Sequence, residues 1–290
     1  MSTSAQPARL NGAIRAFEQG KAAFVTFAHL DLQSTMALRN KTEYDALVYE
    51  MEHSPYDIRG FADNLQYLLD RKHIATTGSL APAVTPFARI PPNGSEMNQW
   101  MAKQVLDMGA YGVLWPHVST VAEARNAVTA CRFPRPKGAP LYEPAGLRGD
   151  GPGRAVNYWG ISLEDYYERA DVWPLNPKGE ILVGIMCEEV LAIKNLPAML
   201  KEVPGIGYVV IGRADLSQDL GVSRRHTHPT MLAAMDEILG ICQAHKVPCG
   251  LPGVSTEEVE GLLTKGYRWL MTAPSPSYAN LELGRKLNGR

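Results

Sequence analysis

The sequence predicts a parallel α/β fold in which eight strands close into a barrel. Two observations lead to this prediction. Eight short apolar runs have the character of strands, and a segment with helical spacing follows each of them along the 290-residue chain. The number of strand–helix units and the chain length together favour one (β/α)8 barrel, with an open, doubly wound sheet as the alternative.

The predicted strands are short, and their bodies are apolar. They are Lys21–Ala28, Tyr44–Met51, Pro86–Ile90, Tyr111–Val118, Glu180–Glu188, Gly205–Gly212, 247–253 and 267–273. The helices expected after them cover 30–41, 57–72, 95–109, 120–132, 189–203, 227–246, 255–266 and 280–290. Local signals support several helix ends. Gly109 is expected to be a C-cap, and Pro229 lies in a first helical turn. Ser255 and Glu258 have the spacing of a capping box.

Two segments do not follow this alternation. Residues 132–179 are rich in proline, glycine and aromatic residues and are too long for a plain loop, so we expect an ordered excursion over one barrel face. Residues 1–12 lack the apolar core of a secretory signal and are expected to be a short flexible lead-in. Because no linker, repeat or low-complexity tract divides the chain, residues 1–290 are expected to form a single domain.

The composition argues against nucleic-acid and membrane partners. The formal net charge is -1, no basic run exceeds two adjacent residues, and no apolar run is long enough to span a bilayer. The four cysteines form no CxxC pair. In a chain of this size without a secretory signal, reduced thiols are favoured over disulfides, so we expect a cytoplasmic protein.

Polar residues gather where the predicted strands end. In (β/α)8 barrels the catalytic side chains lie at the C-terminal ends of the strands. Five predicted strands end in, or run into, such residues: Glu50, Glu52, His53, Arg89, His117, Glu188, Glu189, Arg213 and Asp215. The sequence therefore predicts one active site at this end of the barrel.

The strand-end residues suggest a site for one divalent cation. Glu188 and Asp215 come from neighbouring strands and could share an ion such as Mg²⁺, which takes one or two carboxylates and leaves positions for water and substrate oxygens. No clustered His/Cys set indicates a tight zinc site. Arg89 could bind a carboxylate or a developing oxyanion. His53 is suited to carry a proton, since a histidine titrates near neutral pH.

Six segments, taken together and in this order, resemble a known family. They are Glu50–Asp57 (EMEHSPYD), Ala88–Asn93 (ARIPPN), Leu106–Val118 (LDMGAYGVLWPHV), Gly146–Ala155 (GLRGDGPGRA), Ile185–Leu196 (IMCEEVLAIKNL) and Val209–Gly221 (VVIGRADLSQDLG). The resemblance is to the HpcH/HpaI aldolase/citrate lyase family, in particular its class II pyruvate aldolases. It extends over about residues 20–287.

This resemblance implies a fold and an ion. It implies a barrel of the phosphoenolpyruvate/pyruvate type, a divalent ion (Mg²⁺, Mn²⁺ or Co²⁺), and aldol chemistry through a pyruvate enolate. Glu188 and Asp215 match the family's metal ligands. The backbone amides around Ala214 and Asp215 match those that receive the substrate carboxylate.

The resemblance also implies roles for three further residues. Arg89 matches the arginine that holds the keto oxygen, and His53 matches the acid–base histidine. Asp107 matches an aspartate that partners this histidine. At about 1.5 Å per residue, the predicted helix places Asp107 roughly 20 Å from the C-terminal ends of the strands in its own chain. The histidine that Asp107 partners should therefore come from a neighbouring subunit. The family's assembly implies a homo-oligomer, hexameric or built from trimers.

The chain departs from the family pattern at three positions. Met186 stands where a glutamine is common, Arg213 replaces a proline, and Glu50 replaces an aspartate. None of these removes a metal ligand, but each could change the pocket, the metal preference or the substrate. The roles of Glu52, His29 and His117 are left open between substrate contact, support of the site and ordinary loop polarity.

The expected activity is that of an aldehyde-lyase. A 4-hydroxy-2-oxo acid would be cleaved to pyruvate and an aldehyde, or formed from them, with these small molecules as the partners. The alternatives on the same scaffold are a citrate-lyase-like or malyl-CoA-type lyase, an oxaloacetate decarboxylase, and a barrel without catalytic activity. The sequence shows no basic groove for the phosphates of CoA, and the residues that match the family's site argue against a non-catalytic barrel.

Overall fold

The strands of the computed structural model, which describes residues 8–273 and 279–290, form a closed parallel barrel. They are β1 (Ala23–Ala28), β2 (Ala46–Glu50), β3 (Thr85–Arg89), β4 (Gly112–Trp115), β5 (Val172–Trp173), β6 (Ile181–Cys187), β7 (Tyr208–Ile211), β8 (Cys249–Leu251) and β9 (Trp269–Met271). The sheet order is β4-β3-β2-β1-β9-β8-β7-β6-β5, and the pairing of β4 with β6 closes it. Short β5 pairs only with the start of β6. The other eight strands confirm the predicted (β/α)8 fold.

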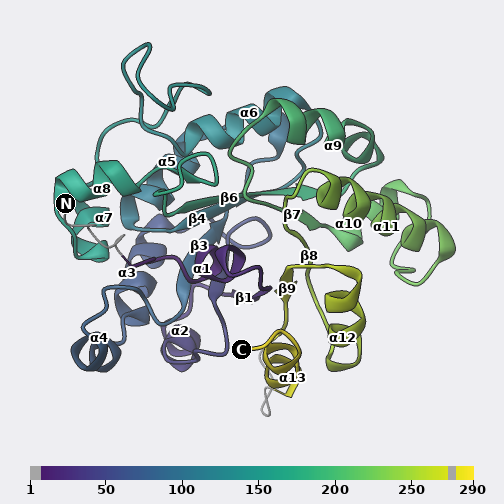
Figure 1. Cartoon of the computed structure of the whole chain (residues 1–290), viewed down its shortest axis with the longest axis horizontal. Helices are drawn as coiled ribbons and strands as arrows, with labels where there is room; N and C mark the ends of the chain where they lie inside the picture. Colours follow the sequence, from purple (N-terminus) through teal and green to yellow (C-terminus); the bar gives the residue numbers. More distant parts are fainter. Residues whose placement is uncertain (1–7, 274–278) are drawn as a thin grey trace, which may run out of the picture.

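Helices surround the barrel (Figure 1). They are α1 (Gly12–Glu18), α2 (Leu32–Leu38), α3 (Ile58–Leu68), α4 (Arg71–Thr77), α5 (Gln99–Met108), α6 (Val121–Ala130), α7 (Gly153–Trp159), α8 (Leu163–Arg169), α9 (Val190–Glu202), α10 (Arg213–Asp219), α11 (Pro229–Ala244), α12 (Thr256–Lys265) and α13 (Ala279–Leu287), with a 3-10 turn η1 (Gly94–Glu96) before α5. Among the described residues, no helix has both the length and the apolar character needed to cross a bilayer.

The predicted helix signals are confirmed in the structure. Gly109 ends α5 with φ 121°, a backbone region that favours glycine, and Pro229 is the first residue of α11. The capping box of Ser255 and Glu258 opens α12. These signals are local, which is why they can be recognised without knowledge of the tertiary contacts.

The N-terminal lead-in is structured over its described part. Asn11 caps α1 by accepting hydrogen bonds from the amides of Ala13 and Ile14. Its Nδ2 also donates to the carbonyls of Tyr111 and Glu180, 3.1 and 3.0 Å away, at the start of β4 and β6. The helix α1 therefore closes the N-terminal end of the barrel (Figure 1). The expectation of a flexible segment is wrong from residue 8 onward, and residues 1–7 lie outside the described part.

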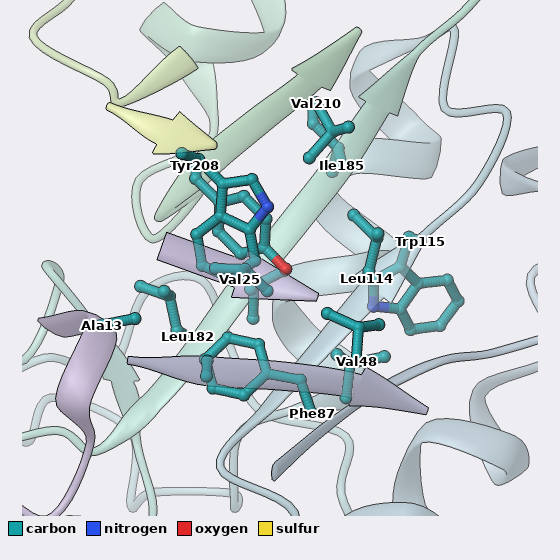
Figure 2. Close-up of a cluster of buried hydrophobic side chains, with 14 of the residues drawn as sticks. Ala13, Val25, Val48, Phe87, Leu114, Trp115, Leu182, Ile185, Tyr208 and Val210 are labelled. Carbon is teal, nitrogen blue, oxygen red and sulfur yellow. The ribbon is translucent and has the colours of Figure 1, made fainter. Parts of the chain in front are cut away.

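The barrel interior is filled with large side chains. Phe87, Leu182 and Tyr208 meet there (Figure 2), and the ring of Tyr208 stacks on Trp269 with centroids 3.9 Å apart. This packing requires glycine at position 184, because a Cβ built there would lie 2.1 Å from Cζ of Tyr208. The interior is thus a packed core, and any substrate must bind at an end of the barrel.

The excursion at residues 132–179 is ordered and contains α7, α8 and β5. Trp159 stacks on Tyr111 with ring centroids 4.3 Å apart, and its indole Nε1 donates to the carbonyl of Gly109. β5 pairs with the first residues of β6. The excursion therefore packs beside α5 and the N-terminal ends of β4 and β6, away from the carboxyl ends of the strands.

A buried ion pair ties the two ends of the excursion together. Arg132 Nε donates to Asp171 Oδ1 at 2.7 Å, and its other nitrogens donate to the carbonyls of Leu141 and Pro144. Burial alone would raise the pKa of Asp171, but the hydrogen bond and charge of Arg132 outweigh it and lower the pKa below its usual value. The charge of Asp171 is therefore stabilised in the folded state.

We expect Asp171→Asn to destabilise the fold by about 3 kcal/mol, because it leaves the Arg132 charge buried without its partner. The stabilisation is fully present above the pKa of an unfolded aspartate, about 3.9, and is lost as the pH falls through the lower native pKa. Urea unfolding at pH 7 measures the loss. The matched control is Asp236→Asn, which breaks an exposed pair with Lys265 and should cost less than about 1 kcal/mol. Equal losses in the two variants would contradict the interpretation.

Candidate metal and substrate site

The carboxyl ends of five strands bring a group of charged side chains together. Parallel pairing sets Glu50 at the end of β2 beside Arg89 at the end of β3. β4 and β6 are also neighbours, and so are β6 and β7. The residues that follow these strands complete the group, which consists of Glu50, Glu52, Arg89, His117, Glu188, Glu189 and Asp215.

Three side chains of this group are close enough to hold one ion. One ligand atom from each of His117, Glu188 and Asp215 lies within 4.8 Å of the others. Glu188 follows β6 and is only 2% exposed. Gly212 leaves room for it, because a Cβ at that position would lie 2.0 Å from Glu188 Oε2. Asp215 is in the first turn of α10 and is partly exposed. The predicted pair of carboxylates is therefore adjacent, and a histidine joins it.

The cluster contains more carboxylates than positively charged groups. Only Arg89 and His117 can balance the charges of its five acidic side chains. Burial, with smaller contributions from the charges of Glu52 and Asp215, raises the pKa of Glu188 to about 7, against the charge and backbone hydrogen bond of His117. Burial acts to lower the pKa of His117, but Glu188 and Glu189 outweigh it, so the net direction is upward. A donor set of buried carboxylate, second carboxylate and imidazole around unneutralised negative charge fits a divalent cation.

Arg89 is held between two carboxylates and is 8% exposed. Its Nε donates to Glu50 Oε2 at 2.8 Å and its Nη2 contacts the same oxygen, while Nη1 lies 2.9 Å from Glu52 Oε2. Its guanidinium also lies 4.7 Å from the ring centroid of Phe27. Arg89 is thus a fixed positive group at the C-terminal mouth of the barrel, the end at which the strands finish and where Glu188 also lies.

Glu50 has a second set of contacts that the sequence did not indicate. Its Oε1 accepts hydrogen bonds from the backbone amides of Glu52 and His53, at 2.7 and 3.1 Å. One carboxylate therefore holds both the guanidinium of Arg89 and the turn that carries His53. Burial raises the pKa of Glu52, and the charges of Arg89 and His53 oppose this.

His53 lies on the rim of the site. Its side chain is 64% exposed, and its Nε2 lies 3.5 Å from Glu52 Oε2. His29, after β1, is exposed, and no described contact joins it to the cluster. The exposure of His53 leaves one side of its ring accessible to a group outside its own chain.

Asp107 is not part of this mouth. It lies in the last turn of α5, whose C-terminal end leads into the start of β4, at the opposite end of the barrel. Its Oδ1 accepts a hydrogen bond from the buried Arg148 at 2.8 Å. Burial raises the pKa of Asp107, and Arg148 acts against that rise. Asp107 and His53 of one chain are therefore kept apart, as the helix geometry predicted.

A shallow open depression of about 520 Å³ lies over the cluster. Its lining includes His117, Glu188, Glu189, Asp215 and Gln218. A larger hollow of about 700 Å³ is lined by Phe133, Tyr167 and their neighbours in the excursion, and none of the charged strand-end residues lines it. The smaller depression is the one with the chemistry of a metal site.

Comparison with known proteins identifies the family. The model of the HpcH/HpaI aldolase/citrate lyase family matches residues 23–272. The chain belongs to this family. The 4-hydroxy-2-oxovalerate aldolase of Rhodococcus jostii is 34% identical over 222 residues, covering 77% of this chain and 72% of that protein. The hydroxypyruvate/pyruvate aldolase of Roseobacter denitrificans is 28% identical over 269 residues, covering 92% of both chains.

Solved structures agree on the fold. A HpcH/HpaI aldolase/citrate lyase family protein from Burkholderia cenocepacia J2315 superposes with a TM-score of 0.73, at 23% identity, over 94% of this chain and 96% of that one. The resemblance noted in the sequence is therefore confirmed. The expected enzyme class, a carbon–carbon lyase of the aldolase kind, is confirmed at that general level.

The three departures from the HpcH/HpaI pattern have structural counterparts. Met186 Sδ accepts a hydrogen bond from Arg89 Nη1 at 3.5 Å, so it borders this arginine. Arg213 turns away from the cluster and donates to the carbonyls of Pro252 and Gly253, tying α10 to the loop after β8. Glu50 fixes Arg89. Two of the departures therefore act on Arg89.

Proposed function

We propose that this member of the HpcH/HpaI family is a class II pyruvate aldolase that depends on a divalent metal ion. It would cleave a 4-hydroxy-2-oxo acid to pyruvate and an aldehyde, or form that acid from them. The observation that carries the proposal is the adjacency of buried Glu188 to Asp215, with Arg89 at the same mouth. Relatives named as aldolases of 4-hydroxy-2-oxo acids support the reaction class.

The site residues have separate tasks in this reaction. Glu188 and Asp215 would hold Mg²⁺, Mn²⁺ or Co²⁺, which supplies Lewis-acid polarisation of the 2-oxo carbonyl. Arg89 would donate to the carbonyl oxygen and stabilise the negative charge that develops on it in the enolate. Ala214 and Asp215 lie in the first turn of α10, where backbone amides lack intrahelical acceptors and can receive the substrate carboxylate.

Proton transfer is assigned to His53. In the cleavage direction, a base assisted by His53 takes the proton from the hydroxyl on C4, and the C3–C4 bond breaks to release the aldehyde. The electron pair of that bond remains on the pyruvate fragment as an enolate, and protonation at C3 gives pyruvate. Because His53 is exposed and accessible, a group from another subunit can orient its ring.

We further propose a homo-oligomer, hexameric or built from trimers, in which Asp107 of one subunit partners His53 of the next. Asp107 is ordered by Arg148 and lies too far along α5 to reach its own strand ends. The excursion lies beside Asp107 and would then form the aldehyde side of the neighbouring site. All four cysteines are buried free thiols, which supports a cytoplasmic location.

A substrate panel tests the proposed reaction. The protein is stripped of metal with a chelator and assayed for pyruvate release from a series of 4-hydroxy-2-oxo acids and from oxaloacetate. We expect no release from the stripped protein and release of pyruvate with an equal amount of aldehyde after Mg²⁺, Mn²⁺ or Co²⁺ is added. Absence of pyruvate from every 4-hydroxy-2-oxo acid with every ion would contradict the proposal. Pyruvate from oxaloacetate alone would indicate a decarboxylase.

A further inference from the structure

His117 occupies an unusual backbone position at the end of β4. Its φ of 51° lies in the left-handed region, which non-glycine residues adopt infrequently and which costs free energy unless the surroundings impose it. The surroundings do impose it. The amide of His117 donates to Glu188 Oε1 at 2.7 Å, and its carbonyl accepts from the amide of Gly94 at 3.1 Å. The backbone is thus fixed on both sides, and Glu188 provides one of the two contacts.

The imidazole of His117 also has a contact that fixes its tautomer. Its Nδ1 lies 3.1 Å from Glu189 Oε1, and the other oxygen of Glu189 contacts the hydroxyl of Ser119. Metal-binding histidines commonly donate one ring N–H to a carboxylate in this way, which leaves the lone pair of the other nitrogen for the ion. With Nδ1 donating to Glu189, the free lone pair is on Nε2, which lies 3.7 Å from Glu52 Oε1. Because Nδ1 is the ring nitrogen nearest to Glu188, at 3.7 Å from Oε1, the ring must turn to bring Nε2 to an ion at Glu188.

The distances suit a shared ion. Ligand atoms about 2.1 Å from a six-coordinate ion lie about 3 to 4.2 Å from each other. The atoms of His117, Glu188 and Asp215 lie within 4.8 Å of one another, so small side-chain movements bring all three to one ion. Three protein ligands leave positions for the two oxygens of a 2-oxo acid, and Arg89 lies at the same end of the barrel, held by Glu50 and Glu52.

We infer that His117 is a third protein ligand of the ion held by Glu188 and Asp215, and that the site selects transition-metal ions over Mg²⁺. This inference rests on the proposed function only for the position of the ion. An imidazole favours ions such as Co²⁺, Ni²⁺ and Zn²⁺, whereas Mg²⁺ prefers an all-oxygen set. The metal preference then follows from this chain's own residue at position 117.

Metal binding tests the inference without an activity assay. The metal-free protein is titrated with Co²⁺ and with Mg²⁺ in wild type, in His117→Asn and in the control His29→Asn. Asparagine also tolerates positive φ, so the backbone should be kept, and circular dichroism checks the fold. We expect His117→Asn to weaken Co²⁺ binding by at least about 10-fold, and Mg²⁺ binding by less than about 3-fold, with a changed Co²⁺ absorption spectrum. The control should match wild type.

A second measurement does not need the variant to fold. Pulsed electron paramagnetic resonance of the wild-type protein loaded with Mn²⁺ should show a nitrogen hyperfine coupling from a coordinated imidazole. Absence of this coupling, or unchanged Co²⁺ affinity and spectrum in His117→Asn, would overturn the inference and leave the proposed aldolase intact. If Glu188→Gln binds Co²⁺ as tightly as the wild-type protein does, the ion does not lie at Glu188 and both proposals fail.

Discussion

Replacing Glu188 with glutamine should lower kcat/KM for pyruvate release by about 10³-fold or more, because an ion that polarises the carbonyl contributes several kcal/mol to catalysis. Glutamine has nearly the same size and fills the space that Gly212 leaves open. Its carbonyl oxygen can still accept the hydrogen bond from the amide of His117. The substitution therefore removes the charge and leaves the packing, so the loss should come from metal binding.

The measurement pairs kinetics with metal content. Pyruvate release is followed in a coupled assay, and bound metal is determined by mass spectrometry after gel filtration. Glu202→Gln is the matched control, since Glu202 is exposed at the far end of α9, the helix that begins two residues after Glu188. It should retain wild-type activity and metal content. A Glu188→Gln protein that keeps both its metal and its activity would exclude Glu188 as a ligand.

Mixing two inactive variants should restore activity if the active site is shared between subunits. His53→Ala and Asp107→Asn are each expected to lower kcat by about 10² to 10⁴-fold through loss of acid–base catalysis. In a randomly assembled 1:1 mixed oligomer, about a quarter of the sites combine an intact His53 with an intact Asp107 from the neighbouring subunit. Activity per site should therefore rise to about a quarter of the wild-type value.

The experiment uses co-expression with two different affinity tags and sequential purification of mixed oligomers. Oligomers of each single variant, purified in the same way, set the baseline. Thermal unfolding shows whether Asp107→Asn is folded, because this change removes the charge that Arg148 contacts. Recovery no greater than the baseline would show that His53 and Asp107 do not act together across subunits. Full activity of Asp107→Asn alone would lead to the same conclusion.

The sequence was sufficient to predict where the charged residues of the candidate site lie. Parallel strands end at the same edge, so Glu50, Arg89, Glu188 and Asp215 could be placed at one mouth from strand boundaries alone. It was also sufficient to separate Asp107 from that mouth, because the rise per residue of a helix is fixed. These are consequences of regular backbone geometry, which hydrophobic spacing reveals.

Contacts between distant segments could not be predicted in the same way. The helices α4 and α10 have seven residues each, too short for a clear periodic signal. The helix α1 depends on contacts of Asn11 with residues about 100 and 170 positions away. The position of His117 depends on its left-handed backbone and on Glu188, and neither produces a pattern in the sequence. Glu189, which fixes the ring, was recognised only as a polar strand end.

The carboxylate of Glu50 has a consequence for how such an enzyme can change over time. One of its oxygens holds the guanidinium of Arg89, and the other holds the two amides of the turn that leads to His53. A shorter aspartate at this position could not keep both sets of contacts without moving the strand ends. Arg89 and His53, to which we assign substrate binding and proton transfer, are therefore both positioned by one carboxylate. Mutations that move Arg89 will tend to move His53 as well, and the reverse also holds. Substrate range and reaction rate should therefore vary together among natural variants of this chain.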